Sequence, residues 1–173
     1  MNQPDSRCGS PKYDGHCATC FKRAFPDDTR SKVIYEHTKE IRVRNFLMAR
    51  YGPGFVHDTP LYTPACDCTH RRRVDHRKLV DGVMLAIETD EFAHRGYNAD
   101  DERVRYEDLF MMHSRKWIFI RFNPDDNRAS GKGVDFEDKL ERLAQEIDTH
   151  MDRISSGVVH QNEDLVETYF LFY

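Results

Sequence analysis

The sequence predicts a mixed α/β domain, and three observations support this prediction. Asp81-Gly82 lies between two short strand-like runs, which is the strongest local signal for a tight β-hairpin. A continuously apolar run at 116–122, with charged residues at its ends, is typical of a buried strand. Segments of helical composition precede and follow that run. A hairpin followed by such crossovers predicts a mixed sheet flanked by helices.

The first third of the chain predicts a loop-rich segment, a helix and a strand. Residues 1–30 contain several glycines and prolines and three of the five cysteines, so we expect a knuckle that a metal orders. Good helix formers with interspersed apolar residues predict a helix over 36–51, which Gly-Pro-Gly at 52–54 ends. Aromatic and β-branched residues predict a strand over 55–62.

The hairpin fixes the expected position of three acids. Its strands are the runs 73–80 and 83–90, and a two-residue turn places Val80 opposite Val83. Counting back along both runs places Asp75 opposite Glu88, on one face of the sheet. Asp90 lies two residues beyond Glu88 and shares that face. Opposed like charges destabilise a sheet by up to ~1 kcal/mol unless something neutralises them, and a divalent cation would do so.

The rest of the chain continues the alternation of helices and strands. Residues 100–113 have helical composition with one apolar face, and a turn at 123–125 ends the buried strand 116–122. A regular apolar stripe predicts a second long helix over 136–154, whose stripe belongs to the core. Residues 164–173 predict a final strand at a sheet edge.

Composition bounds the size and class of the protein. With 173 residues, 39% of them hydrophobic and 32% charged, the chain predicts one folded domain, 31–173, with an appendage over 1–30. No apolar run approaches the ~18 residues of a membrane span and no signal-peptide core is present, so we expect an intracellular protein without a membrane partner.

Because the net charge of the chain is negative, any nucleic-acid binding would have to use a local basic patch. The formal net charge of -4 excludes attraction of the whole molecule to nucleic acid. A basic patch surrounds Asp75 and is either a phosphate-facing surface or a solvated strand edge. Because acids lie within it, the phosphate-facing interpretation is favoured. Its members are Arg71, Arg72, Arg73, Arg77 and Lys78.

The cysteines favour zinc over disulfides. Their odd number argues against a disulfide scaffold. Cys17-Ala-Thr-Cys20 has the spacing of a tetrahedral zinc knuckle. Reduced cysteines without metal are the alternative, since short motifs also occur by chance. The residues able to complete four ligands are Cys8, His16, Cys66 and Cys68.

The acids of the hairpin fit metal-dependent phosphodiester cleavage. That chemistry needs carboxylates on a rigid element to hold Mg²⁺ beside the scissile phosphate, where the metal activates water. Asp75 and Glu88 on adjacent strands meet the requirement, and Asp90 could add an oxygen. The rival interpretation is a surface acid cluster that pairs with Arg73 and Arg77, and geometry alone leaves both open.

Five motifs stand out along the chain: Tyr13 to Phe21, Arg72-Arg-Val-Asp75, Glu88 to His94, Glu102-Arg-Val-Arg105 and Phe119 to Asp125. Together they resemble the PD-(D/E)XK nuclease superfamily, in the branch of the very-short-patch-repair endonucleases. The resemblance is strongest to uncharacterised zinc-knuckle proteins of large DNA viruses and protists, and it covers most of the chain.

This resemblance implies a fold and a set of roles. The fold is a restriction-endonuclease-like α-β-β-β-α-β core with an added C-terminal helix and strand and an N-terminal zinc knuckle. Asp75 and Glu88 would hold Mg²⁺ or Mn²⁺ beside the Thr89 carbonyl, and zinc would be structural. His94 is the candidate for proton transfer or phosphate contact, with a structural histidine as the alternative.

The resemblance also concerns the helix and strand that follow. Glu102 and Arg105 lie three residues apart on one helix face and would sit near the acids, where Arg105 could bind phosphate. The alternative is that these two residues form only a structural ion pair on the helix surface. Arg121 would either support the same site or form a structural salt bridge.

Departures from the family pattern keep a second function class open. Asp90 stands where the superfamily has a lysine, while Val74 and Ala93 replace a proline and a glutamine. The general base is therefore unassigned among His94, a metal-bound water and Lys78. The first hypothesis is a Mg²⁺-dependent DNA endonuclease, intracellular in the host cytoplasm or nucleus, or in a virion. The alternatives are an inactive module that binds nucleic acid or protein, such as a viral assembly or transcription component, and a purely zinc-stabilised structural protein.

Overall fold

The chain forms two compact units, Met1–Arg42 and Val43–Tyr173. The computed structural model describes residues 13–36, 39–59, 61, 73–90, 99–125, 133–161 and 163–173. The sequence interpretation drew its boundary at residues 30 and 31, whereas the compact units divide at Arg42 and Val43.

Two short helices lie in the first unit, α1 (Ala18–Ala24) and α2 (Thr29–Glu36). Phe21 is fully buried there, and its ring lies 5.3 Å from Tyr13 and 5.1 Å from Phe25 between centroids. The Arg30 guanidinium lies 4.6 Å from the Phe21 ring and pairs with Asp14 at 2.8 Å. The expected loop-rich structure was therefore wrong over 18–24, because aromatic packing orders a segment that lacks helical periodicity.

The second unit alternates strands and helices, and α3 (Lys39–Tyr51) leads into it. The elements that follow are η1 (Gly52–Gly54), β1 (Val56–His57), β2 (His76–Val80), β3 (Val83–Thr89), α4 (Ala99–His113), β4 (Trp117–Phe122), α5 (Phe136–Ser155), η4 (Val158–Gln161) and β5 (Val166–Leu171). These bounds confirm the predicted hairpin, the two later helices and the last two strands to within a few residues.

The five strands make one mixed sheet in the order β1-β2-β3-β4-β5. β1, β2 and β3 pair antiparallel, while β3, β4 and β5 run parallel. The register Val80 to Val83 and His76 to Ile87 is the one the Asp-Gly turn predicts. Asp81 and Gly82 have φ of 42° and 86°, as a type I′ turn requires. The mixed α/β class is thus confirmed.

The first strand is shorter than expected. The predicted strand over 55–62 extends only from Val56 to His57. Asp58 has a φ of 38°, in the left-handed region, and this conformation ends the extended run.

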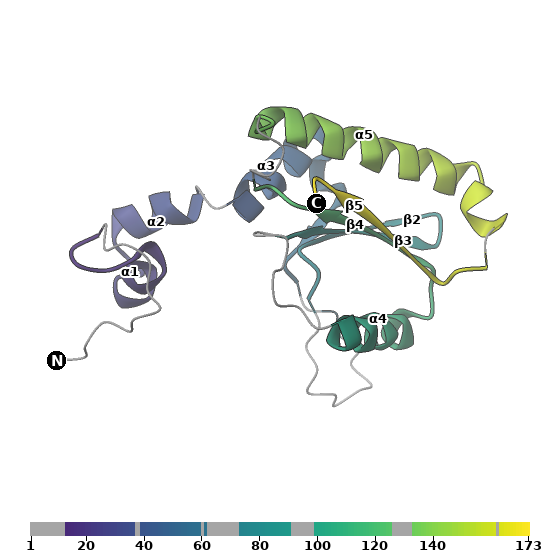
Figure 1. Cartoon of the computed structure of the whole chain (residues 1–173), viewed down its shortest axis with the longest axis horizontal. Helices are drawn as coiled ribbons and strands as arrows, with labels where there is room; N and C mark the ends of the chain where they lie inside the picture. Colours follow the sequence, from purple (N-terminus) through teal and green to yellow (C-terminus); the bar gives the residue numbers. More distant parts are fainter. Residues whose placement is uncertain are drawn as a thin grey trace. The chain divides into compact units, whose positions relative to one another are not determined.

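Helices cover both faces of the sheet, with α5 on one side and α4 on the other (Figure 1). Leu85 and Ile87 of β3 point to the first side and pack with Val43 of α3 and Leu143 of α5. Alternate residues of the same strand point to the α4 side, where Trp117 and Phe119 of β4 pack with Leu109. Because α4 covers the face that bears Met84 and Ala86, Glu88 on the same row also faces that side.

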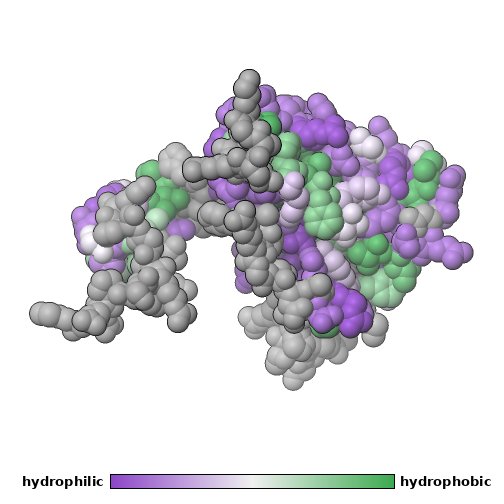
Figure 2. All heavy atoms as spheres, viewed as in Figure 1, coloured by the Kyte–Doolittle hydropathy of each residue, from purple (hydrophilic) through white to green (hydrophobic). Residues whose placement is uncertain are grey.

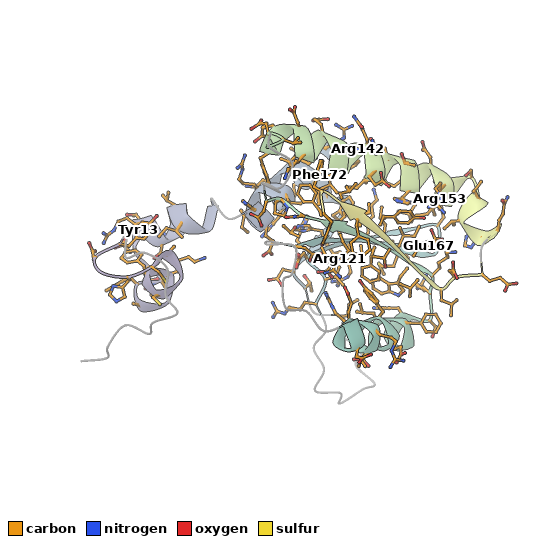
Figure 3. All side chains as sticks on the ribbon, in the orientation of Figure 1. Tyr13, Arg121, Arg142, Arg153, Glu167 and Phe172 are labelled. Carbon is orange, nitrogen blue, oxygen red and sulfur yellow. The ribbon has the colours of Figure 1, made fainter. Side chains whose placement is uncertain are left out.

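A cluster of charged side chains around Glu167 links α5 to β5. Figure 2 shows hydrophilic residues over most of the coloured surface, with apolar residues in smaller patches. Figure 3 labels Glu167 of β5 and Arg153 of α5, which lie 3.0 Å apart between Nη2 and Oε2. Lys116 Nζ lies 2.9 Å from the other carboxylate oxygen of Glu167, and the Tyr169 hydroxyl donates to Glu167 at 2.7 Å.

These contacts decide the charge state of Glu167. Burial acts to raise the pKa of this carboxyl, but hydrogen bonds from Tyr169, Lys116 and Arg153 outweigh it and lower the pKa to about 2. A carboxyl whose pKa is lower in the folded than in the unfolded protein stabilises the fold above its unfolded pKa, 4.5.

We therefore expect Glu167→Gln to lower the free energy of unfolding by roughly 2 kcal/mol at neutral pH. The difference from the parent should shrink as the pH falls from 4.5 towards 2, where the parent carboxyl takes up its proton. Urea denaturation across this pH range measures it. Glu141→Gln, which removes an exposed partner of Arg50, is the control and should change stability by less than ~1 kcal/mol. A pH-independent deficit in Glu167→Gln would contradict this account.

Candidate functional site

The acids and arginines named from the sequence meet on the α4 side of the sheet, where β3 and β4 end. Glu88 and Arg121 are neighbours in the β3/β4 register. Figure 3 labels Arg121 on this side of the sheet, towards α4. Glu102 and Arg105 reach the same place from α4. The structure therefore brings Arg121 together with three of the expected site residues, Glu88, Glu102 and Arg105.

Asp75 joins this group from the residue before β2. Its Oδ2 accepts a hydrogen bond of 2.8 Å from the backbone N–H of Thr89. That bond ties Asp75 to the peptide that follows Glu88, as the register of the hairpin predicts. A strand residue directs its N–H and C=O to the same neighbour, so the Thr89 carbonyl also faces the strand that Asp75 precedes.

Glu88 lies against Arg105. The Arg105 Nη2 group donates to Glu88 Oε1 and also to the backbone carbonyl of Arg73, the latter at 2.8 Å. The exposed fraction of the side chain is 14% for Arg105 and 6% for Glu88, so the pair is largely removed from water. One guanidinium thus links α4 to β3 and to the chain just before Asp75.

Asp90 is held by two groups from elsewhere in the chain. Its Oδ2 accepts from Arg121 Nε and from the Tyr173 hydroxyl. Arg121 Nη1 also contacts Glu102 Oε1 and lies 3.0 Å from the Tyr106 hydroxyl, which itself donates to Glu102 at 2.9 Å. The Asp90 carboxylate and Arg121 are both almost fully buried. Asp90 therefore forms an ion pair with Arg121, whereas the sequence suggested it as a further oxygen ligand of the metal.

Burial sets the protonation of the acids. It raises the pKa of Asp75, against the hydrogen bond from Thr89 and the charge of Arg105. It raises the pKa of Glu88 to about 8; Arg105 opposes this shift and the charge of Asp75 adds to it. For Arg121, burial opposes the charged form, but Asp90 outweighs it and raises the pKa. Burial therefore disfavours the charged forms of both Asp75 and Glu88 more than their hydrogen bonds and neighbouring arginines favour them.

The predicted basic patch is only partly on this face. Arg73 pairs with Asp58 at 3.0 Å and stays about half exposed. Arg77 shares the Asp75 row and donates to the Thr59 carbonyl. Lys78 alternates to the opposite face, where its Nζ lies 5.7 Å from the Phe55 ring centroid. Arg71 and Arg72 lie outside the described residues.

Of the residues named for zinc, the structure describes Cys17, Cys20 and His16, and the His16 Nδ1 atom lies 3.1 Å from the Asp14 carbonyl oxygen. Cys17 caps α1, and its Sγ accepts from the Cys20 N–H at 3.5 Å. Across the parts of the chain that the structure describes, no three His, Cys, Asp or Glu side chains form a metal-holding group. The other predicted residues outside the described ranges are Cys8, Cys66, Cys68 and His94.

Two tyrosines at the site were not identified from the sequence. Tyr106 follows Glu102 by one helical turn, so the spacing of side chains on α4 could have suggested their contact. Tyr173 reaches Asp90 only because β5 pairs with β4, and no local sequence pattern predicts that contact.

Comparison with known proteins identifies no relative. No family model matches the chain, and neither the curated proteins nor the solved structures contain a significant match. Within the described ranges, none of the helices has the length and apolar character that crossing a membrane requires.

The contacts of Arg121 lead to a stability prediction. We expect Arg121→Met to lower the free energy of unfolding by about 3–5 kcal/mol, because it leaves the Asp90 carboxylate buried without its guanidinium. Adding Asp90→Asn should recover at least ~1 kcal/mol, since the uncompensated charge is then gone. Arg103→Met, at an exposed pair with Glu107 on the same helix, should cost less than ~1 kcal/mol. Urea denaturation of the parent, Arg121→Met, Asp90→Asn, the double variant and Arg103→Met measures these values, and strict additivity of the two substitutions would refute the coupling.

Proposed function

We propose that the protein is a metal-dependent nuclease that hydrolyses phosphodiester bonds of DNA, with Asp75 and Glu88 holding Mg²⁺ or Mn²⁺. One observation carries the proposal. Four carboxyl groups meet two guanidiniums on the α4 side of the sheet, so acidic groups outnumber guanidiniums there among the described residues. The carboxylates are Asp75, Glu88, Asp90 and Glu102, and the guanidiniums are Arg105 and Arg121.

The donor atoms suit a hard divalent cation. Mg²⁺ binds oxygen ligands and commonly takes one or two protein carboxylates, with water and substrate phosphate in its other positions. Asp75 and Glu88 supply two carboxylates, and the Thr89 carbonyl opens towards the same strand. The raised pKa values of both acids are what a pair of buried carboxylates shows before a cation compensates it.

The order of elements supports the same assignment. α3, β1, β2, β3, α4 and β4 follow one another in the α-β-β-β-α-β order that the PD-(D/E)XK resemblance implies. Asp75 precedes the second strand and Glu88 lies in the third, which agrees with the roles carried over from that resemblance. α5 and β5 are the added C-terminal helix and strand.

Each residue has a role that follows from its contacts. Arg105 reaches both Glu88 and the chain before Asp75, so a substrate phosphate that bound there would be fixed beside the acids. Arg121 orients Asp90 and Glu102 and acts as a positioning residue. A bound cation would activate the attacking water and offset charge on the leaving oxygen. His94 stays the candidate for proton transfer.

Zinc has a separate, structural place in this proposal. Cys17 and Cys20 lie one helical turn apart at the start of α1, and the Cys17 sulfur faces the Cys20 backbone. The spacing suits two thiolate ligands of one Zn²⁺. Such a knuckle would stabilise the first unit or serve in docking.

A second candidate function is an inactive module that binds nucleic acid or protein on the same scaffold. The contacts of Asp90 favour it, because the place of the superfamily lysine is taken by an acid that Arg121 and Tyr173 hold. Retained binding of DNA with no Mg²⁺- or Mn²⁺-stimulated cleavage would select this candidate.

We expect Asp75→Asn and Glu88→Gln each to abolish Mg²⁺-dependent cleavage of DNA, because each removes a charged metal ligand while leaving a side chain of equal size. Cleavage of labelled single-stranded and duplex DNA, with circular dichroism as the check on folding, tests this. Glu107→Gln is the matched control, since it removes an exposed carboxylate from α4 away from the acids, and it should cleave like the parent. Equal cleavage by the parent and both site variants would sink the assignment.

A further inference from the structure

An exposed aromatic ring lies beside the acids on the last strand. Phe170 is 58% exposed, and in the parallel register of β4 and β5 it is the neighbour of Arg121. Paired residues of adjacent strands point to the same face, so Phe170 lies on the face that carries Glu88 and Asp90. A phenylalanine of that exposure gains little from the core, and its place beside the acids is what distinguishes it from other exposed apolar residues.

Three side chains of β5 point to the α4 side of the sheet, and α4 covers the first two of them but not Phe170. Val166 packs against the apolar cluster under α4. Thr168 comes next on this face and hydrogen-bonds Tyr106 of α4. Phe170 is the third of the row and the first to be exposed. The uncovered ring therefore lies at the end of the sheet where the acids are.

Tyr173 fixes this ring to the site. Its ring meets Phe170 edge to face, with centroids 5.0 Å apart and planes at 83°. Its hydroxyl donates to the Asp90 carboxylate, while 44% of the residue stays exposed. An aromatic pair whose polar end is bound to a buried carboxylate is oriented in a way that an isolated surface ring is not.

We propose that Phe170 and Tyr173 form a stacking platform for an unpaired base, so that the substrate is single-stranded or locally unpaired DNA. This inference rests on the proposed function and names its substrate class. Every base has an aromatic face, and stacking on a protein ring contributes about 1–3 kcal/mol per base whatever the sequence. Bases within a duplex are already stacked and offer no such face.

The distance of Phe170 from the acids favours a nucleotide base, rather than an apolar protein segment, as the group that contacts the ring. Glu88 on β3 and Phe170 on β5 are separated by one intervening strand, and two strand spacings amount to about 10 Å. A nucleotide whose phosphate lies at Glu88 and Arg105 can therefore bring a neighbouring base to the ring.

The test compares three labelled probes of about 20 nucleotides, longer than the site of one stacking domain. They are a single strand, the same strand without bases, and the duplex, each bound to the zinc-loaded full chain by fluorescence anisotropy with Ca²⁺ in place of Mg²⁺. The base-free strand keeps the phosphates, so it isolates the electrostatic part of binding. Phe170→Ala should weaken binding of the normal single strand about tenfold and leave the other two probes within about twofold of the parent.

Two further variants complete the design. Phe170→Trp keeps an aromatic face and should retain single-strand binding. Leu165→Ala truncates another exposed apolar residue at the opposite end of β5 and should bind every probe as the parent does. Circular dichroism confirms that the variants fold.

Several outcomes would overturn the platform. One is an equal loss of affinity for the normal and base-free strands in Phe170→Ala, and another is no loss of affinity in that variant. A third is a dimer of the parent, measured by light scattering, that Phe170→Ala dissociates, because the ring would then be an interface between copies of the chain. Failure of the nuclease proposal looks different, since the platform would then bind single strands through Phe170 without any Mg²⁺-dependent cleavage. Cleavage that is indifferent to Phe170 would refute the platform alone.

Discussion

A two-residue turn is the constraint on which the rest of the site depends. Positive φ at Asp81 and Gly82 matches the twist of the hairpin and fixes the register of β2 against β3. With that register, Asp75 reaches the Thr89 amide and lies beside Glu88. A slip of one residue would turn Glu88 away from α4 and from Arg105. Local backbone geometry therefore determines which acids share a face.

Compensation of buried charge is the second theme of the molecule. Removal of a carboxylate from water costs several kcal/mol unless charged hydrogen bonds replace the lost hydration. Glu167 has three such partners and a lowered pKa, as a structural carboxylate should. Asp90 has Arg121 and Tyr173. Asp75 and Glu88 keep raised pKa values instead, which sets them apart from the acids that stabilise the fold.

Local patterns in the sequence predict most of the second unit but not its long-range contacts. The hairpin and the apolar stripe of α5 are periodic, so their elements could be identified directly. α1 could not, because aromatic contacts of Phe21 rather than periodicity order it. The acids were identified through strand register, whereas the roles of Tyr173 and Phe170 depend on how β5 pairs with β4, which no short segment encodes.

Calorimetric titration of Mn²⁺ into the parent and into Asp75→Asn tests the central claim most directly, because it asks whether Asp75 and Glu88, the two buried acids with raised pKa values, form a cation site. The parent should bind one ion, and Asp75→Asn should bind it at least about tenfold more weakly, since a charged ligand has been lost. Zinc-loaded protein in both titrations keeps the cysteines out of the comparison. Identical isotherms for the two proteins, or no binding by the parent, would contradict the account.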